Sequence, residues 1–287
     1  MTFRGSKTTD SLKALKQYRH EQFAQFHDVN DDQTILGIAP ELDAVSLNSY
    51  LNPVMFNVYS YLTSYVLGLS TQESPGTYND TRKSAVKILD WGCGYGFVSY
   101  LLQRSDNEIV SCETPEMAAS ARNAPFVRHG HIDIVELKHE YLLLFPDSEF
   151  DVVVGCAVLE HVSDDAESLK EIARILKPGG FFFCFHLPRT CSWTQRLDQL
   201  RKSPDHDRLC TAKKAKKLLD NANLTLLDIW HRAVFPKFSF VPTHVAGIER
   251  LDQWLCRYTP LKYLATNVEF LAQKPDDGQH PPRDGVL

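Results

Sequence analysis

The stretch VKILDWGCGYGF, residues 86–97, decides the fold. An apolar run ends in an aspartate and leads directly into three alternating glycines, Gly92, Gly94 and Gly96. A buried strand, a glycine turn and a helix in this order let a parallel α/β sheet bring its backbone close to a nucleotide. The stretch therefore predicts a nucleotide site, and its details should indicate which nucleotide is bound.

The details argue against a pyrophosphate ligand. The dinucleotide pattern GxGxxG fails because Phe97 or Ser99 stands where the third glycine belongs, and no GK[ST] follows. Asp90 precedes the turn, and a carboxylate there repels phosphate but attracts an ammonium or sulfonium group. S-adenosylmethionine has an adenosine and both cations but no phosphate, so it fits this turn. Glu113 ends the next apolar run, where an acid can accept hydrogen bonds from both ribose hydroxyls.

The chain alternates apolar runs with helical segments after residue 85. Strands are predicted at 86–91, 108–113, 132–137, 150–158 and 181–188, and again within 211–233 and 263–275. Between them, an apolar stripe that reaches Leu176 predicts a helix ended by Pro178. Such alternation implies right-handed crossovers and an α/β, doubly wound parallel sheet.

Composition divides the chain into five parts. They are a helical lid or cap at 1–82, a cofactor-binding core at 83–187, an acceptor-covering insertion at 188–215, a C-terminal completion of the core sheet at 216–276, and a disordered tail at 277–287. The lid and the segment 188–260 are rich in aromatic residues, which favours a small hydrophobic or aromatic acceptor.

The region from about 85 to 187 resembles the class I S-adenosylmethionine-dependent methyltransferases, particularly the group that includes ubiquinone and menaquinone biosynthetic enzymes. The resemblance lies in VKILDWGCGYG, the acid of IVSCETPEM, LLLFPDSEFDVVVGCAVLEHV and LKEIARILKPGGFFF, in this order. It implies a Rossmann-like, mostly parallel seven-stranded sheet with helices on both faces and an N-terminal helical lid. S-adenosyl-L-methionine is the implied cofactor and S-adenosyl-L-homocysteine the product.

The resemblance also implies a cofactor site. Its residues are Asp90, Gly92, Cys93, Gly94, Glu113, Thr114, Glu140 and Cys156, with Ala157 beside the last. His139 stands where the family commonly has an aspartate that contacts the adenine, so the adenine contact is assigned to Glu140 or to a backbone amide.

Three histidines are candidates for a general base, which would help a hydroxyl acceptor. His186 ends a predicted strand at the ligand-facing rim, His206 lies in the predicted insertion, and His161 follows the fourth predicted strand. Helix-start packing is the alternative role for His161, and a solvated loop position is the alternative for His206. A metal site formed by Glu160, His161 and His206 is conceivable, but no spacing requires it, and none is predicted.

The net charge of −5 argues against a nucleic-acid partner bound through its phosphates. Seven cysteines without a CxxC pair and an N-terminus without an apolar signal segment predict a cytoplasmic protein with reduced thiols. The apolar stretch 51–70 carries too many polar residues to predict a transmembrane segment. The predicted partner is a small-molecule methyl acceptor, and a homodimer is compatible with the sequence.

The prediction is a methyltransferase that acts on a small molecule, at oxygen, by in-line transfer with help from a histidine. Methylation at carbon or nitrogen of a quinone-like or lipid acceptor is an alternative. A protein that binds the cofactor without catalysis, as a partner of another protein, is a second alternative.

Overall fold

The structure is a computed structural model, and it describes residues 9–25, 27–70, 85–189, 192, 210–235 and 245–276. His206, most of the predicted insertion and the predicted tail lie outside these residues. So do three of the aromatic residues of the segment 188–260, namely Trp193, Phe238 and Phe240.

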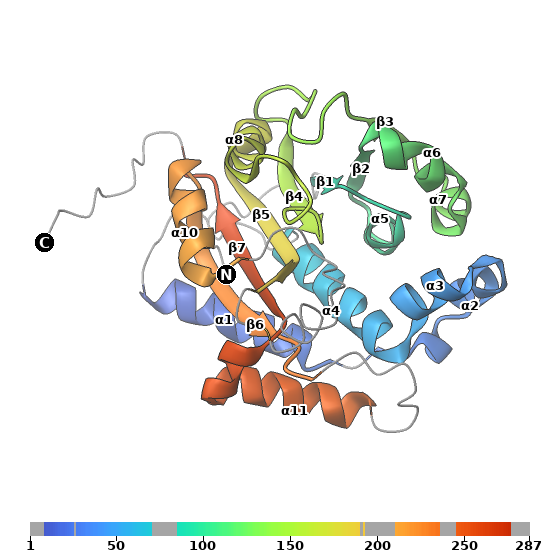
Figure 1. The fold of residues 1–287 in the computed structure, drawn as a ribbon, viewed down its shortest axis with the longest axis horizontal. Helices are drawn as coiled ribbons and strands as arrows, with labels where there is room; N and C mark the ends of the chain where they lie inside the picture. The colour runs from blue at the N-terminus through green and yellow to red at the C-terminus, as the bar shows by residue number, and fades with distance from the viewer. Residues whose placement is uncertain are drawn as a thin grey trace, which may run out of the picture.

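Seven strands of the described chain form one sheet in the order β3-β2-β1-β4-β5-β7-β6 (Figure 1). Their bounds are β1 (Lys87–Trp91), β2 (Glu108–Glu113), β3 (Ile134–Glu136), β4 (Phe150–Cys156), β5 (Leu176–Pro188), β6 (Thr225–Arg232) and β7 (Asn267–Gln273). Pairing is parallel from β3 to β5, and β7 runs antiparallel to β5 and β6. The order reverses between β1 and β4, so the glycine turn after β1 opens where such sheets bind ligands. The predicted seven-stranded, mostly parallel fold is confirmed.

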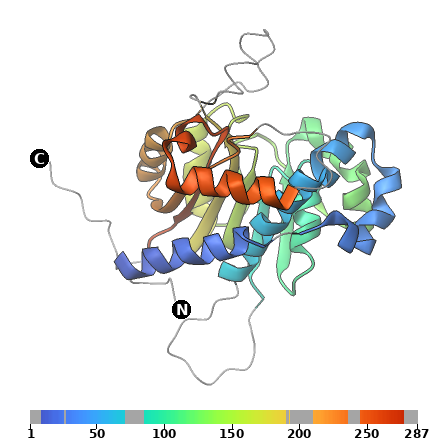
Figure 2. The same ribbon diagram turned by 90° about the horizontal axis from the view of Figure 1, so that it is seen from below.

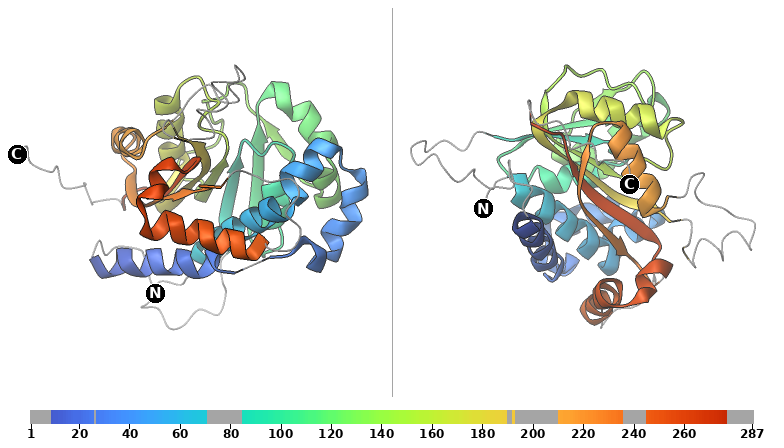
Figure 3. Two further views of the ribbon diagram at one scale, coloured as in Figure 1. Left: turned by 60° about the horizontal axis from the view of Figure 1, so that its bottom comes forward. Right: turned by 90° about the vertical axis from the view of Figure 1, so that its left-hand side faces the viewer.

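Helices cover both faces of this sheet. Their bounds are α1 (Thr9–Phe23), α2 (Gln33–Ile38), α3 (Ala44–Ser46), α4 (Pro53–Ser70), α5 (Phe97–Leu102), α6 (Pro115–Asn123), α7 (Pro125–Gly130), α8 (Asp165–Ile175), α10 (Ala212–Asn221) and α11 (Val245–Tyr258), with short turns η1 (Val29–Asp31), η2 (Ala39–Glu41), η3 (Leu47–Leu51) and η4 (Pro260–Leu264). The right-hand view of Figure 3 shows the sheet between α8 and α10 on one side and α1 and α4 on the other.

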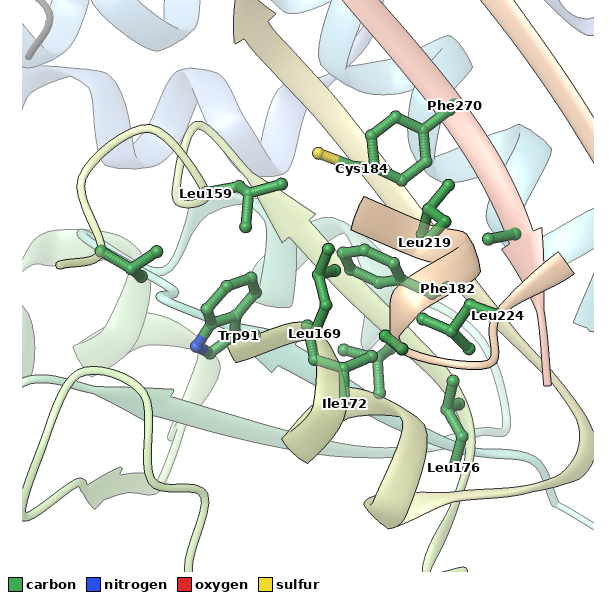
Figure 4. Close-up of a cluster of buried hydrophobic side chains, with 14 of the residues drawn as sticks. Trp91, Leu159, Leu169, Ile172, Leu176, Phe182, Cys184, Leu219, Leu224 and Phe270 are labelled. Atoms are coloured by element: carbon green, nitrogen blue, oxygen red, sulfur yellow. The ribbon is translucent and has the colours of Figure 1, made fainter. Parts of the chain in front are cut away.

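Alternate residues of the central strands supply the two cores. Leu89 and Phe182 pack with α8 and α10, whereas Ile88 and Phe183 pack with α1 and α4. Figure 4 shows the first of these cores, where Trp91 lies with side chains of α8 and α10. A strand buried on both faces reads as a continuous apolar run, which is why these strands were visible in the sequence.

Two elements differ from the sequence-based expectation. The helix α8 ends at Ile175 and Leu176 already belongs to β5, where it pairs with Phe150 of β4. Helix α11 was not predicted, because its buried face carries Asp252, which interrupts the apolar pattern. That carboxylate accepts hydrogen bonds from the backbone amides of Ala233 and Val234 at 3.0 and 2.7 Å. Among the described helices, none has the length and apolar content needed to cross a membrane.

Candidate active site

A cavity of about 780 Å³ opens at the carboxyl ends of β1, β2 and β4. This volume falls within the range of about 300–1,000 Å³ typical of small-molecule and cofactor sites. The glycine turn forms one wall, and side chains from η3 and α4 form another. The cavity therefore combines the predicted nucleotide turn with residues of the N-terminal segment.

Asp90 lies at the base of this cavity and is held by Ser99, which in turn pairs with Ser111. Ser99 of α5 donates its hydroxyl to Asp90 Oδ2 at 2.5 Å, and the Ser99 and Ser111 hydroxyl oxygens are 2.7 Å apart. All three side chains are 1% exposed or less. Ser99 is one of the two residues that break the dinucleotide pattern. Its hydroxyl orients the Asp90 carboxylate, the group that disfavours a phosphate ligand at this turn.

Burial raises the pKa of the Asp90 carboxyl to about 6, although the hydrogen bond from Ser99 opposes this shift. The negative charge of Glu113 also contributes to this raised pKa. A cation in the cavity would favour the ionised form of Asp90 and would relieve its repulsion from Glu113. The pair of carboxylates thus fits a ligand that carries positive charge.

Glu113 ends β2 with its carboxylate fixed by two backbone amides. Gly94 N–H donates to Oε2 at 2.8 Å and Thr114 N–H donates to Oε1 at 2.7 Å. A carboxylate oxygen can accept more than one hydrogen bond, so both oxygens can still accept from neighbouring hydroxyls. This arrangement suits a ribose diol.

The turn itself needs glycine at two positions for different reasons. Gly92 has φ +67°, and a Cβ there would lie 2.6 Å from the Val158 side chain. Gly94 has φ +53°, but a Cβ there would meet nothing within 4 Å. The backbone at Gly94 therefore borders open space, which is a cradle that a ligand can fill.

Aromatic side chains form the wall opposite the turn. Tyr50 of η3 and Tyr59 of α4 line the cavity, and each packs against Phe97, with ring centroids 5.2 and 5.3 Å apart. Phe97 is the second residue that breaks the dinucleotide pattern. Burial raises the pKa of both tyrosines above the ordinary value, so each presents a neutral phenol at physiological pH.

The thiols at the cavity are not nucleophiles. Burial is the largest cause that raises the pKa of the Cys93 and Cys156 thiols, and the charge of Asp90 adds to it. A thiol that stays protonated is a small apolar side chain here. His139 and Glu140 both line the cavity near Leu137, so the structure leaves either beside the adenine end.

The structure separates the three predicted histidines. His161 lines the cavity and has an exposed side chain. His186 is not among the cavity-lining residues and lies behind Tyr59, with the two rings stacked at 5.4 Å. His206 lies outside the described residues. Within the described chain, no cluster of three His, Cys, Asp or Glu side chains could hold a metal ion.

The cavity gathers every predicted cofactor residue and adds others. The predicted residues that line it are Asp90, Gly92, Cys93, Gly94, Glu113, Thr114, Glu140 and Cys156, together with Ala157 and His161. Aromatic residues of the N-terminal segment were expected near the acceptor, but the sequence did not single out Tyr50 and Tyr59, because it does not say which faces of η3 and α4 meet the turn.

Comparisons with known proteins agree with this geometry. A family model described as a methyltransferase domain matches residues 89–184. A relative from Mycolicibacterium smegmatis, named "Probable S-adenosylmethionine-dependent methyltransferase", is 29% identical over 167 residues, which is 58% of each chain. A ubiquinone biosynthesis O-methyltransferase from Caulobacter vibrioides is 34% identical over 104 residues, 36% of this chain and 41% of that relative.

A solved methyltransferase structure from Galdieria sulphuraria has the same fold. It matches with a TM-score of 0.52 and 16% identity, over 86% of this chain and 99% of that chain. The curated relatives are matched over less than two thirds of their own length.

The family match places a methyltransferase domain at residues 89–184, and the fold and the cavity agree with that match. The chain contains an S-adenosylmethionine-dependent methyltransferase domain whose family match covers residues 89–184, and S-adenosylmethionine is the cofactor of this class. The carboxylates of Asp90 and Glu113 and the open space at Gly94 fit that cofactor.

Proposed function

We propose that this protein methylates a hydroxyl group of a small aromatic or hydrophobic molecule. One observation carries the proposal: a single cavity joins the paired carboxylates of Asp90 and Glu113 to the neutral aromatic wall of Tyr50 and Tyr59. The first pair suits the cationic cofactor, and the second suits an apolar, planar acceptor beside it.

The residues have distinct roles in this proposal. Asp90 and the glycine turn hold the methionine end, and Glu113 holds the ribose. When bound, S-adenosylmethionine supplies an activated methyl group on a sulfonium centre. Tyr50 and Tyr59 then align the acceptor and exclude water, since in-line displacement depends mainly on positioning.

A base is useful when the acceptor is a hydroxyl. Two described histidines line the cavity, His139 beside Glu140 and His161 after β4. We assign to His161 the role of the base that accepts the proton of the acceptor hydroxyl. His186 acts on the acceptor through Tyr59 and is therefore a positioning residue. Oxygen as the acceptor atom also agrees with the names of relatives such as the Caulobacter vibrioides enzyme, which is a ubiquinone biosynthesis O-methyltransferase.

The test is incubation of the protein and a cell extract with a methyl-labelled donor, followed by mass spectrometry of the small molecules. The expected result is a labelled aromatic or hydrophobic product whose fragments place the label on oxygen. A label on carbon or nitrogen would replace the oxygen assignment with the corresponding alternative. Donor binding without any labelled product would favour a non-catalytic, cofactor-binding protein.

The base assignment has its own test once an acceptor is in hand. His161→Asn should lower kcat by about 100-fold, the size typical of a lost general base, with cofactor affinity retained. His131→Asn is the matched control, because His131 is exposed and has φ +50°, a conformation that Asn tolerates. Equal activity of the two variants would remove His161 from the proposed chemistry.

A further inference from the structure

A second, smaller pocket lies away from the methyltransferase cavity. It has a volume of about 200 Å³ and is formed by α1, the edge strand β6, α11 and η4. None of its lining residues lines the larger cavity. Figure 2 shows α1 and α11 side by side at this place, where Gln253 Nε2–H donates to the Phe23 carbonyl at 2.6 Å.

Positive side chains dominate this pocket. Five cationic residues line it, against two carboxylates: Lys16, Arg19, Arg232, Arg257 and Lys262, against Asp228 and Asp252. The whole chain has a net charge of −5, so this local excess is opposite in sign to the rest of the molecule. The cations come from four separate elements and converge on one hollow.

The carboxylates near the pocket are already engaged. Asp228 accepts from Arg19 Nε at 2.7 Å, with both side chains buried. Arg232 Nη2 donates to Glu269 Oε1 at 2.7 Å. Asp252 accepts backbone N–H groups from the loop after β6.

Three cations are left without a carboxylate partner within the described residues. They are Lys16 and Arg257, which are exposed, and Lys262, which is half-buried. A pocket that holds three such cations has a strong positive potential, and a concave shape concentrates it.

The pKa values of two histidines in the pocket, His20 and His231, are lowered in part by the same positive charges. The pKa of His20 is lowered to about 4, mainly by burial and also by the charges of Arg19, Arg257 and Lys16. Burial also lowers the pKa of His231 to about 4, with added effects from Arg189 and Lys262. Both rings are therefore neutral at physiological pH, and a bound anion would move their titration upward.

The size of the pocket limits the ligand. Sites for drug-sized molecules span about 300–1,000 Å³, so this pocket suits a smaller group. Ammonium and guanidinium donors from three elements match the several oxygens of a tetrahedral anion. We propose that this pocket binds a phosphate group, either free or carried on a small metabolite, through Lys16, Arg257 and Lys262. This proposal does not depend on the proposed methyl acceptor.

The test uses inorganic phosphate at pH 7.5, with chloride adjusted to keep the ionic strength constant. Nuclear magnetic resonance should show saturable shifts of the His20 and His231 ring signals. The variant Lys16→Gln/Arg257→Gln/Lys262→Gln should bind phosphate at least about tenfold more weakly, as expected for loss of charge-assisted hydrogen bonds. Its circular dichroism and its affinity for S-adenosylmethionine should match the wild type, because none of the three residues lines the cofactor cavity.

The matched control removes three lysines elsewhere. Lys213, Lys216 and Lys217 are exposed on α10, and the triple change to Gln should leave phosphate affinity within about twofold of the wild type. A parallel titration with glycerol 3-phosphate separates the two sources of the group: tighter binding of the ester indicates a metabolite ligand. The proposal is overturned if neither ligand binds saturably, or if the pocket variant and the α10 variant lose the same affinity.

Discussion

The ring of His186 lies stacked on the ring of Tyr59, with centroids 5.4 Å apart and planes inclined by 20°. Tyr59 faces the methyltransferase cavity, and His186 is backed by Arg232, whose Nη2 is 3.2 and 3.3 Å from the two ring nitrogens. His186 has φ +59°, and its backbone N–H donates to Glu269 at 3.1 Å. A strained histidine is thus held between the cavity wall and a buried ion pair, which points to a positioning role.

Replacing His186 should therefore loosen Tyr59 without removing a base. Asn tolerates the left-handed conformation of this residue, so His186→Asn isolates the loss of the stacked ring. We expect a rise of about tenfold in the KM for the acceptor, a smaller fall in kcat and an unchanged pH profile. Tyr59→Phe keeps the stacked ring and should stay near wild type. Loss of one limb of the pH–rate profile in His186→Asn would instead identify His186 as the base.

Asp90→Asn should separate stability from cofactor binding. Because burial raises the pKa of Asp90 to about 6, keeping it ionised at pH 7 costs the folded state up to about 3 kcal/mol. The variant removes that cost, so the free protein should unfold at a higher temperature. It should also bind S-adenosylmethionine at least about 100-fold more weakly, because the neutral amide no longer attracts the cation. Calorimetry of unfolding and titration calorimetry of binding measure the two effects. An unchanged affinity would contradict the assignment of Asp90 to the cofactor.

Cofactor affinity should depend on pH with a defined sign. The charged Asp90 carboxylate attracts the cofactor, and protonation removes that attraction. The affinity should be constant above about pH 6 and should fall below it. In the complex, Asp90 should become protonated at a lower pH than in the free protein, because the bound cofactor favours the ionised form. Titrations from pH 5 to pH 8 in the wild type and in Asp90→Asn test this. A slope of equal size in both proteins would assign the pH dependence to another group.

The charged residues of the site could be predicted from the sequence, but the side chains that pack around them could not. The aspartate before the glycines indicated a cationic ligand, and the structure brings Asp90, Glu113 and Gly94 together as that argument requires. These residues follow strands whose order is fixed by the fold, so their meeting point could be predicted. Phe97 and Ser99 were recognised only as departures from a dinucleotide pattern. Their contacts with Tyr59 and Asp90 depend on packing distances that no local pattern encodes.

The direction of the His186 side chain could not be predicted from the sequence either. His186 lies two residues before the end of β5, near the rim of the sheet that its place in the sequence indicated. However, its left-handed backbone and the shift in pairing register between β5 and β7 beside it put the ring behind Tyr59. A bulge of this kind re-aims a side chain, and periodicity does not reveal it.

Glu160 offers a test of buried charge beside the site. Its side chain is 1% exposed, and neither carboxyl oxygen has a hydrogen-bond partner in the described part of the chain. Burial raises the pKa of this carboxyl to about 8. A folded-state pKa above the unfolded value means that stability is highest at low pH and falls as the pH rises from about 4.5 to about 8.

Glu160→Gln should therefore flatten this dependence. The glutamine cannot ionise, so we expect its advantage in the free energy of unfolding over the wild type to grow by about 3–4 kcal/mol between pH 5 and pH 8. Urea denaturation at both pH values measures the change. Glu167→Gln is the matched control, because Glu167 is exposed and pairs with Lys170 at the surface, so it should follow the wild type. If the free energy of unfolding of Glu160→Gln depends on pH in the same way as that of the wild type, the Glu160 carboxylate is stabilised in the folded protein. That result would refute the burial of an unpartnered acid.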